Sequence, residues 1–255
     1  MSLQTLFGNK VDIAIERLRQ FEPPEGYYLA FSGGKDSVVI LDLAKKAGVK
    51  YDAHYNFTTV DPPELVEFIK TYSEVEISKP TISMWQLIVK KRMPPTRVVR
   101  YCCEHLKERG GSGRIVITGV RKEESSKRKK YGVVIQCRND IYKKLVNPIV
   151  DWTEEDVWEY IRDNGVSYCG LYDKGFKRLG CVMCPLSSKS QMVKESIFWP
   201  KYKRAYILAF KRMIDKRKQD GMETEWETGE EVFDWWINGG EEDKDNEDQG
   251  RFFFE

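Results

Sequence analysis

The chain has 255 residues and a nearly balanced charge, since 42 basic and 40 acidic side chains leave a formal net charge of +2. Its 41% hydrophobic and 13% aromatic content is enough for a packed core and excludes wholesale disorder, while the balanced charge excludes a uniformly basic binder of nucleic acid or membrane. No apolar run approaches the ~18–20 residues of a membrane span, and the first residues lack a basic start followed by an apolar stretch. We therefore expect a cytoplasmic protein with no membrane partner.

Taken in chain order, short apolar runs typical of strands alternate with amphipathic stretches typical of helices. Strands are expected at 27–31, 51–58, 75–77, 114–120, 133–137 and 145–149. Helices are expected at 9–21, at 62–71 with Asp61 as N-cap, and at 84–93. Another helix is expected to begin within 32–37 and to end at Gly48. A capping box at 153–156 predicts a further helix that runs to about Asn164, with Trp158 facing inward. This alternation predicts an α/β fold with a mainly parallel sheet.

The pattern changes after Cys184 to long helical stretches at 200–218 and 230–238. An acidic run at 241–248 and three consecutive phenylalanines at 252–254 follow them. We therefore expect two domains: an α/β domain over 1–184, and a helical C-terminal extension with an acidic tail over 185–255.

The segment Ser32-Gly33-Gly34-Lys35-Asp36-Ser37 lies where an expected strand ends and a helix begins. Backbone N–H groups at a helix start lack partners and point the positive end of the helix dipole outward, which favours an anion. Gly33 and Gly34 permit unusual dihedral angles, and the hydroxyls of Ser32 and Ser37 can donate to phosphate oxygens. The segment matches neither a Walker A loop nor a dinucleotide fingerprint. It predicts a phosphate or pyrophosphate site, with a simple capping turn as the alternative.

This hexapeptide is similar to the SGG-x-DS signature of the PP-loop adenine-nucleotide enzymes. Three further segments match the same enzymes in order, at 119–128, at 147–158 and at 171–176, and the last is followed by Gly180-Cys181-x-x-Cys184. Together they resemble the phosphoadenosine phosphosulfate (PAPS) and adenosine phosphosulfate (APS) reductase family over about residues 27–190.

The resemblance implies a Rossmann-like, adenine nucleotide alpha hydrolase-like sheet with ATP, APS or PAPS at the carboxyl ends of its strands. The implied nucleotide-binding residues are Ser32, Gly33, Gly34, Lys35, Asp36, Ser37, Thr58, Arg121, Glu124 and Ser125. The implied catalytic residues are Asp36, Arg121 and Arg128. The planar guanidinium groups suit phosphate or sulfate oxygens, and Glu124 can hold one of them in place. Asp36 is expected to orient Mg²⁺ if ATP is the substrate, and otherwise to cap the helix.

Four cysteines, Cys102, Cys103, Cys181 and Cys184, resemble the iron–sulfur ligands of APS reductases and of cluster-bearing PAPS reductases. Four thiolates suit either a [4Fe–4S] cluster or Zn²⁺, because both are soft enough for sulfur. The adjacent pair strains a tetrahedral zinc site, so we favour the cluster and keep zinc as the alternative.

The match fails at the thiol with which reductases of this family attack sulfur near the C-terminus, because no cysteine follows Cys184. One hypothesis is an ATP-using enzyme of sulfur transfer, with release of AMP and pyrophosphate, in which 126–130 and 90–92 contact nucleic acid. The second is a reductase with a thiol from a donor protein or from Cys137 or Cys169. The third is a non-catalytic nucleotide-binding partner. We prefer the first.

Overall fold

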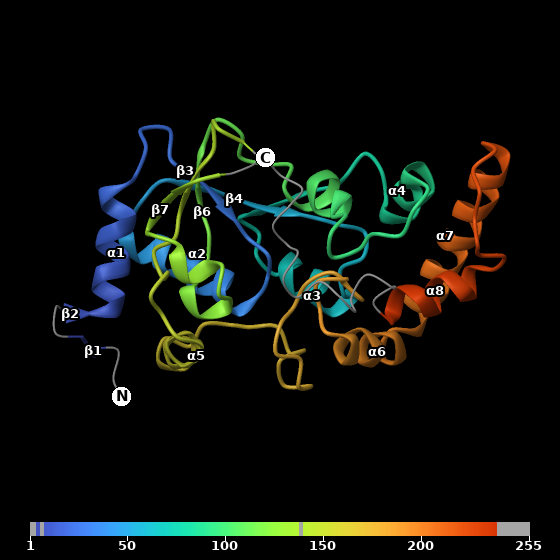
Figure 1. The fold of residues 1–255 in the computed structure, drawn as a ribbon. Helices are drawn as coiled ribbons and strands as arrows, with labels where there is room; N and C mark the ends of the chain where they lie inside the picture. Colours follow the sequence, from blue (N-terminus) through green and yellow to red (C-terminus); the bar gives the residue numbers. More distant parts are fainter. Residues whose placement is uncertain (1–3, 6–7, 138–139, 239–255) are drawn as a thin grey trace. The chain divides into compact units, whose positions relative to one another are not determined.

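The computed structural model describes residues 4–5, 8–137 and 140–238, and within them it contains a six-stranded sheet and eight α-helices (Figure 1). The strands are β1 Gln4–Thr5, β2 Gly8–Asn9, β3 Tyr27–Ala30, β4 Tyr51–Asn56, β5 Val75–Ser78, β6 Ile115–Ile117, β7 Val134–Gln136 and β8 Lys144–Val146. The helices are α1 Lys10–Gln20, α2 Lys35–Ala47, α3 Pro63–Lys70, α4 Met84–Lys91, α5 Glu154–Asp163, α6 Lys189–Phe198, α7 Pro200–Gln219 and α8 Gly229–Ile237. Short helical turns are η1 Cys103–Lys107, η2 Lys122–Glu124 and η3 Arg128–Lys130.

The main sheet has the order β5-β4-β3-β6-β8-β7, and all of its pairs are parallel except the edge pair β7–β8. The central strand β3 pairs with β4 on one side and with β6 on the other, with Leu29 opposite Ala53 and Ile117. This arrangement confirms the predicted α/β fold with a mainly parallel sheet. It also places the loop after β3 at the carboxyl end of the sheet, where ligands bind in open α/β folds.

The chain divides into two compact units that are discontinuous in sequence. The sheet unit comprises the described residues of Met1–Asn56, Pro63–Ser78 and Arg109–Leu179. The helical unit comprises those of Phe57–Pro62, Lys79–Glu108 and Gly180–Glu255. The division expected from sequence was instead a single boundary at residue 184.

The sheet unit is organised around α2, which packs against both α1 and α5. The helix buries a nearly continuous apolar run, as expected for a helix between a sheet and other helices. The helix ends at Gly48, as predicted. Gly48 has φ 70°, a left-handed conformation that glycine adopts at little energetic cost and that commonly ends helices. The predicted capping box of α5 is also present between Thr153 and Asp156.

The helical unit is organised around α7, which packs against α4, α6 and α8. Its core is aromatic: the ring centroid of Trp236 lies 4.7 Å from that of Tyr206 and 5.4 Å from that of Phe210. The Trp236 indole N–H donates to the Pro95 carbonyl at 2.6 Å, which satisfies the polar atom of a buried tryptophan. Aromatic packing therefore joins the C-terminal helices to the segment that follows α4.

Two sequence expectations change in detail. Helix α3 begins at Pro63, and the Asp61 carboxylate accepts hydrogen bonds from the Thr58 main chain and hydroxyl. Trp158 is only half-buried and packs edge-on against Tyr168 and Tyr172, whereas Trp152 is fully buried. The acidic run at 241–248 and the phenylalanines at 252–254 lie outside the described residues. Among the described helices, none has the length and apolar content needed to cross a bilayer.

Candidate functional site

The loop between β3 and α2 requires glycine at its second position. Gly33 has φ 70°, a left-handed conformation that side chains with a Cβ atom rarely adopt. A Cβ atom at Gly33 would also lie 2.7 Å from Ile69 Cγ1 and 2.8 Å from Leu65 Cδ1 of α3. Dihedral angle and space therefore both select glycine here.

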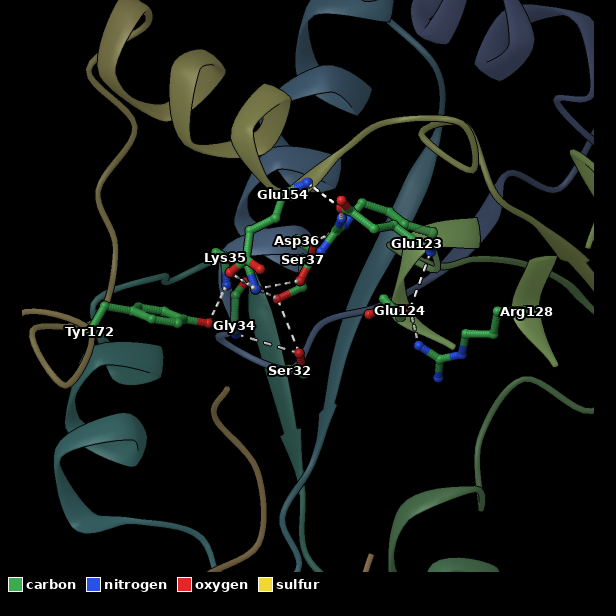
Figure 2. A network of polar contacts seen from close by, with 11 residues as sticks. Ser32, Gly34, Lys35, Asp36, Ser37, Glu123, Glu124, Arg128, Glu154 and Tyr172 are labelled. Atoms are coloured by element: carbon green, nitrogen blue, oxygen red, sulfur yellow. Dashed lines mark hydrogen bonds and ion pairs between the residues drawn. The ribbon is translucent and has the colours of Figure 1, made fainter. Parts of the chain in front are cut away.

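The N-terminus of α2 has no side-chain cap, because its N-cap residue is Gly34 (Figure 2). The Ser37 hydroxyl donates to the Gly34 carbonyl at 2.8 Å, and the Ser32 hydroxyl donates to Ser37 at 3.2 Å. The Asp36 N–H has no acceptor in the part of the chain that the structure describes. An uncapped helix start with an unpaired amide and two nearby hydroxyls is suited to an anion.

Tyr172 is a residue of this loop site that sequence reasoning did not assign. Its hydroxyl accepts the Lys35 N–H at 2.9 Å (Figure 2). Its ring packs edge-on against Trp158, with 5.0 Å between the ring centroids. Burial is the main cause that raises the pKa of Tyr172, so the hydroxyl stays protonated and remains a donor. The sequence signal that could have identified Tyr172 was its position within segment 171–176, which matches the family motif.

Asp36 binds side chains and does not cap α2. Its Oδ1 accepts from Arg121 Nε at 2.7 Å, and its Oδ2 lies 3.6 Å from the Lys35 ammonium. The Arg121 side chain is only 4% exposed, so the pair is largely removed from water. Gly119 permits this approach, since a Cβ atom there would lie 2.9 Å from the Asp36 Cβ. The structure therefore brings together Asp36 and Arg121, two of the three residues predicted to be catalytic.

Arg121 and Arg128 are held by neighbouring carboxylates. Arg121 Nη1 donates to Glu123 at 2.8 Å, and Arg128 forms an ion pair with Glu124 (Figure 2). Burial lowers the pKa of Arg128, and the positive charges of Arg178 and Arg121 lower it further. The positive charge of Arg178 therefore adds to the electrostatic environment of Arg128, an effect that the sequence motifs alone did not indicate.

Ser125 and Thr58 have different surroundings from those that the resemblance implied. The Ser125 hydroxyl accepts the Arg128 main-chain N–H at 3.3 Å, so it supports the turn that carries Arg128. Thr58 belongs to the helical unit, where its hydroxyl donates to Asp61 at 2.8 Å and accepts from the Cys181 thiol at 3.4 Å. Thr58 is thus a neighbour of a predicted metal ligand.

All four candidate metal ligands belong to the helical unit. The thiols of the adjacent Cys102 and Cys103 act on each other, which raises the pKa of Cys102 and lowers that of Cys103 to about 6. The Arg100 guanidinium, 3.6 Å from Cys103 Sγ, favours the Cys103 thiolate further. Electrostatic interaction with Cys181 and Cys184 also raises the pKa of Cys102. The 181–184 segment therefore acts electrostatically on Cys102.

The second pair of cysteines lies on a turn with a strained residue. Met183 has φ 54°, which is unfavourable for a side chain of this size, and its N–H donates to the buried Glu195 carboxylate at 2.5 Å. The Val182 N–H donates to the Val60 carbonyl at 2.8 Å. Burial raises the pKa of Cys181 to about 12. The surrounding structure thus fixes a turn conformation that the sequence alone would not favour.

The described residues contain no group of three or more His, Cys, Asp or Glu side chains arranged to hold a metal ion. His105 lies in the same π-helical turn as Cys103, and its Nε2 is buried without a hydrogen-bond partner in the described structure. Such an atom is a donor or acceptor that a ligand could satisfy.

The two remaining cysteines differ in accessibility. Cys169 is 1% exposed, and burial raises its pKa, so its thiol is protonated and shielded from a substrate. Cys137 follows β7 and is half-buried, with its main-chain N–H bonded to the Lys143 carbonyl. Cys169 is therefore poorly placed to act as a nucleophile.

The chain resembles known proteins over most of the sheet unit. Residues 26–187 match the family model described as the phosphoadenosine phosphosulfate reductase domain. An uncharacterized protein of Methanocaldococcus jannaschii is 30% identical over 72% of this chain and 47% of its own length, and a second from the same organism is 33% identical over 68% and 39%. This chain thus spans less than half the length of either protein. An adenosine 5'-phosphosulfate reductase of Bacillus subtilis is 30% identical over 62% of this chain and 72% of its own length.

Solved structures share the fold. A PAPS reductase from Candida auris, crystallised with phosphate, matches with a TM-score of 0.51 at 23% identity, over 66% of this chain and 87% of its own. A variant of the FMN adenylyltransferase of Candida glabrata matches with a TM-score of 0.50 at 15% identity, over 68% of this chain and 61% of its own. At these identities the similarity shows the fold alone.

Proposed function

Because the chain belongs to the phosphoadenosine phosphosulfate reductase domain family, we propose that loop 32–37 binds the phosphates of an adenine nucleotide in an enzyme of sulfur metabolism. The observation that carries the proposal is the uncapped start of α2, where the Asp36 amide has no acceptor in the described structure and Gly33 is held left-handed. The nearby positive charges of Arg121 and Arg128 support it, since an arginine can bind two phosphate oxygens at once.

The preferred reaction uses ATP to activate an acceptor for sulfur transfer. An acceptor oxygen attacks the α-phosphorus of ATP, and the bond from that phosphorus to the bridging oxygen breaks, so that pyrophosphate leaves with the electron pair. A sulfur nucleophile then displaces AMP from the adenylated acceptor. The main-chain amides of the loop hold the pyrophosphate, and Arg121 and Arg128 offset the negative charge that develops on it.

Magnesium fits this site in a limited way. Mg²⁺ takes oxygen ligands and often binds mainly through substrate phosphates with one or two carboxylates. Asp36 is the acidic residue of the loop, and its carboxylate already accepts from Arg121. Asp36 would contribute at most one oxygen, and Mg²⁺ when bound would neutralise phosphate charge. Because this carboxylate already pairs with Arg121, we assign Asp36 the role of orienting the Arg121 guanidinium.

A sulfonucleotide reductase is the second candidate, favoured by relatives that are named as adenosine 5'-phosphosulfate reductases. Such an enzyme transfers the sulfur of APS or PAPS to a thiol, and the nucleotide leaves as AMP or its 3'-phosphate. The low exposure of Cys169 disfavours it as that thiol. In this reading a donor protein supplies the sulfur nucleophile.

We also propose that Cys102, Cys103, Cys181 and Cys184 hold a [4Fe–4S] cluster. A zinc ion needs its four sulfurs in one tetrahedron at about 2.3 Å from the metal. A cluster gives each thiolate its own iron and so accepts ligands that are further apart. The four soft thiolate donors and the adjacent pair Cys102-Cys103, which strains a tetrahedral zinc site, support the cluster over zinc. When bound, the cluster would supply a redox-active or sulfur-relaying centre.

The function is tested by parallel incubation with ATP, APS and PAPS after anaerobic purification. The preferred reaction predicts AMP and pyrophosphate from ATP, whereas the reductase predicts sulfite from APS or PAPS with a thiol donor. Arg128→Gln should weaken nucleotide binding about 10-fold. The matched control is Lys129→Gln, which removes the same charge from the exposed neighbouring residue. Binding without turnover of any of the three would favour a non-catalytic partner, and absence of binding would refute the loop assignment.

The cluster is tested by iron and sulfide analysis of the same preparation. We expect about four irons and four sulfides per chain, and their loss in Cys102→Ser but not in the matched Cys137→Ser variant. One zinc per chain with no sulfide would instead support the zinc alternative, and four free thiols without metal would refute both.

A further inference from the structure

The helical unit contains a hollow between α4 and α7 that takes no part in the proposed chemistry. Its cavity volume is about 580 Å³, and most of its lining surface is apolar. Trp85 and Val89 of α4 form apolar wall, while Lys90, Arg92 and Arg212, together with Lys216 of α7, bring four positive charges to it. A hollow of this size accommodates a small-molecule-sized group such as a nucleotide.

The two helices that form this hollow, which we call the α4–α7 groove, are strongly basic. Helix α7 carries eight lysines and arginines against a single acidic residue, Asp215. Helix α4 ends in two lysines, is followed by Arg92 and contains no acidic residue. The overall balance of charge in the chain therefore conceals a local positive field that attracts a polyanion.

Part of this charge is unpaired. Asp220 forms ion pairs with both Arg92 and Lys216. Within the described residues, Lys90 and Arg212 form no ion pair. At least two cations at the groove are therefore available to bind phosphates without breaking an ion pair.

Trp85 gives the groove a second recognition element. The indole is half-buried, and the Tyr206 ring packs edge-on against it at 5.0 Å and 81°. This contact holds the indole in a fixed position at the wall of the groove. A fixed aromatic surface beside cations is the combination by which proteins stack the bases and bind the backbone of single strands.

We propose that the α4–α7 groove binds single-stranded nucleic acid, with a base stacked on Trp85 and neighbouring phosphates bound by Lys90 and Arg212. A duplex has no free base face for Trp85, and an acidic peptide would leave the aromatic surface unused. The proposal rests on residues of the helical unit alone, and no residue of loop 32–37 belongs to that unit. Binding at the groove can therefore be measured without a nucleotide at the loop.

The test is fluorescence anisotropy of the full-length chain with a labelled 20-nucleotide oligo-dT at several salt concentrations. We expect salt-sensitive binding, with a slope of log affinity against log salt of about −0.7 for each phosphate bound. Arg212→Gln combined with Lys90→Gln should reduce the slope by about 1.4 and weaken binding about 10-fold at low salt. Trp85→Leu should weaken binding about 10-fold with an unchanged slope.

The matched control is Lys50→Gln combined with Lys70→Gln, which removes two positive charges from the sheet unit. It should change the affinity for the oligonucleotide by less than about 2-fold. Asp220→Asn should tighten binding about 2-fold, because it releases Arg92 and Lys216. Thermal unfolding of each variant shows whether it is folded. Equal losses in the control and groove variants would overturn the proposal. So would absence of oligonucleotide binding, or preferential binding of a labelled poly-glutamate peptide that the groove variants abolish.

Discussion

In the sheet unit, the candidate anion site consists largely of main-chain atoms from six consecutive residues, 32–37, whereas in the helical unit the candidate metal ligands come from two distant segments, 102–103 and 181–184. The first site needs a strand, a left-handed glycine and an uncapped helix start, all of which are local. The second needs distant chain segments to meet and a turn to hold Met183 at φ 54°. A site built from consecutive residues can be predicted from a sequence motif. The geometry of a site built from distant segments depends on how the rest of the chain packs.

The largest expected effect comes from Gly33→Ala. The substitution forces a Cβ atom into a left-handed residue and within 2.7 Å of Ile69, so we expect a loss of about 2–4 kcal/mol in the free energy of unfolding. Urea denaturation measures it. Gly48→Ala has the same φ but open space and should cost only about 1–2 kcal/mol, and Gly34→Ala, with φ −76°, less than about 1 kcal/mol. Equal effects at all three positions would contradict the steric explanation.

Asp36→Asn should have the next largest effect. It removes the carboxylate that pairs with the buried Arg121 at 2.7 Å, while Glu123 still pairs with the same guanidinium. We expect a loss of about 1.5–3 kcal/mol in the free energy of unfolding, measured by urea denaturation. Glu123→Gln is the control, and because that side chain is 51% exposed its loss should be below about 1 kcal/mol. A larger loss of stability for Glu123→Gln than for Asp36→Asn would show that Glu123, and not Asp36, is the main partner of Arg121.

A pH experiment distinguishes the thiols of the helical unit from Cys169. With the pKa of Cys103 lowered to about 6, its thiolate predominates above that pH in the metal-free chain and is protonated below it. Alkylation by iodoacetamide, followed by peptide mass spectrometry, should rise through a midpoint near 6 at Cys103 and be about 10-fold faster there than at an ordinary thiol at pH 7. Cys169 should react slowest, because it is buried and its pKa is raised. A midpoint near 9 at Cys103 would contradict the assigned environment.

The smallest expected effect is at Arg178. Because its charge acts on Arg128, Arg178→Gln should weaken nucleotide binding about 3–5-fold with no loss of thermal stability. Calorimetric titration with ATP and APS measures the change, and Lys177→Gln is the neighbouring control. A loss in both variants would indicate a general charge effect on the sheet unit.

Particular residues show how far the sequence could be interpreted. The β-strand and helix at the loop, the glycine stop of α2 and the capping box of α5 are local patterns, and the structure confirms each. The family follows from motifs that keep their order along the chain, and the match over 26–187 confirms it. Tyr172 was contained in one of those motifs, but its contact with the Lys35 amide was not predictable from spacing.

What the sequence alone determined is the α/β alternation and the glycine turn between β3 and α2, because main-chain geometry over a few residues follows from glycine, capping residues and hydrophobic period. Only the tertiary structure decided that Asp36 pairs with Arg121 and that the charge of Arg178 acts on Arg128. It also decided that Thr58 lies beside Cys181 and that α4 and α7 form one basic groove. Those relations depend on how side chains from distant segments pack, and packing is not encoded in any local window of the chain.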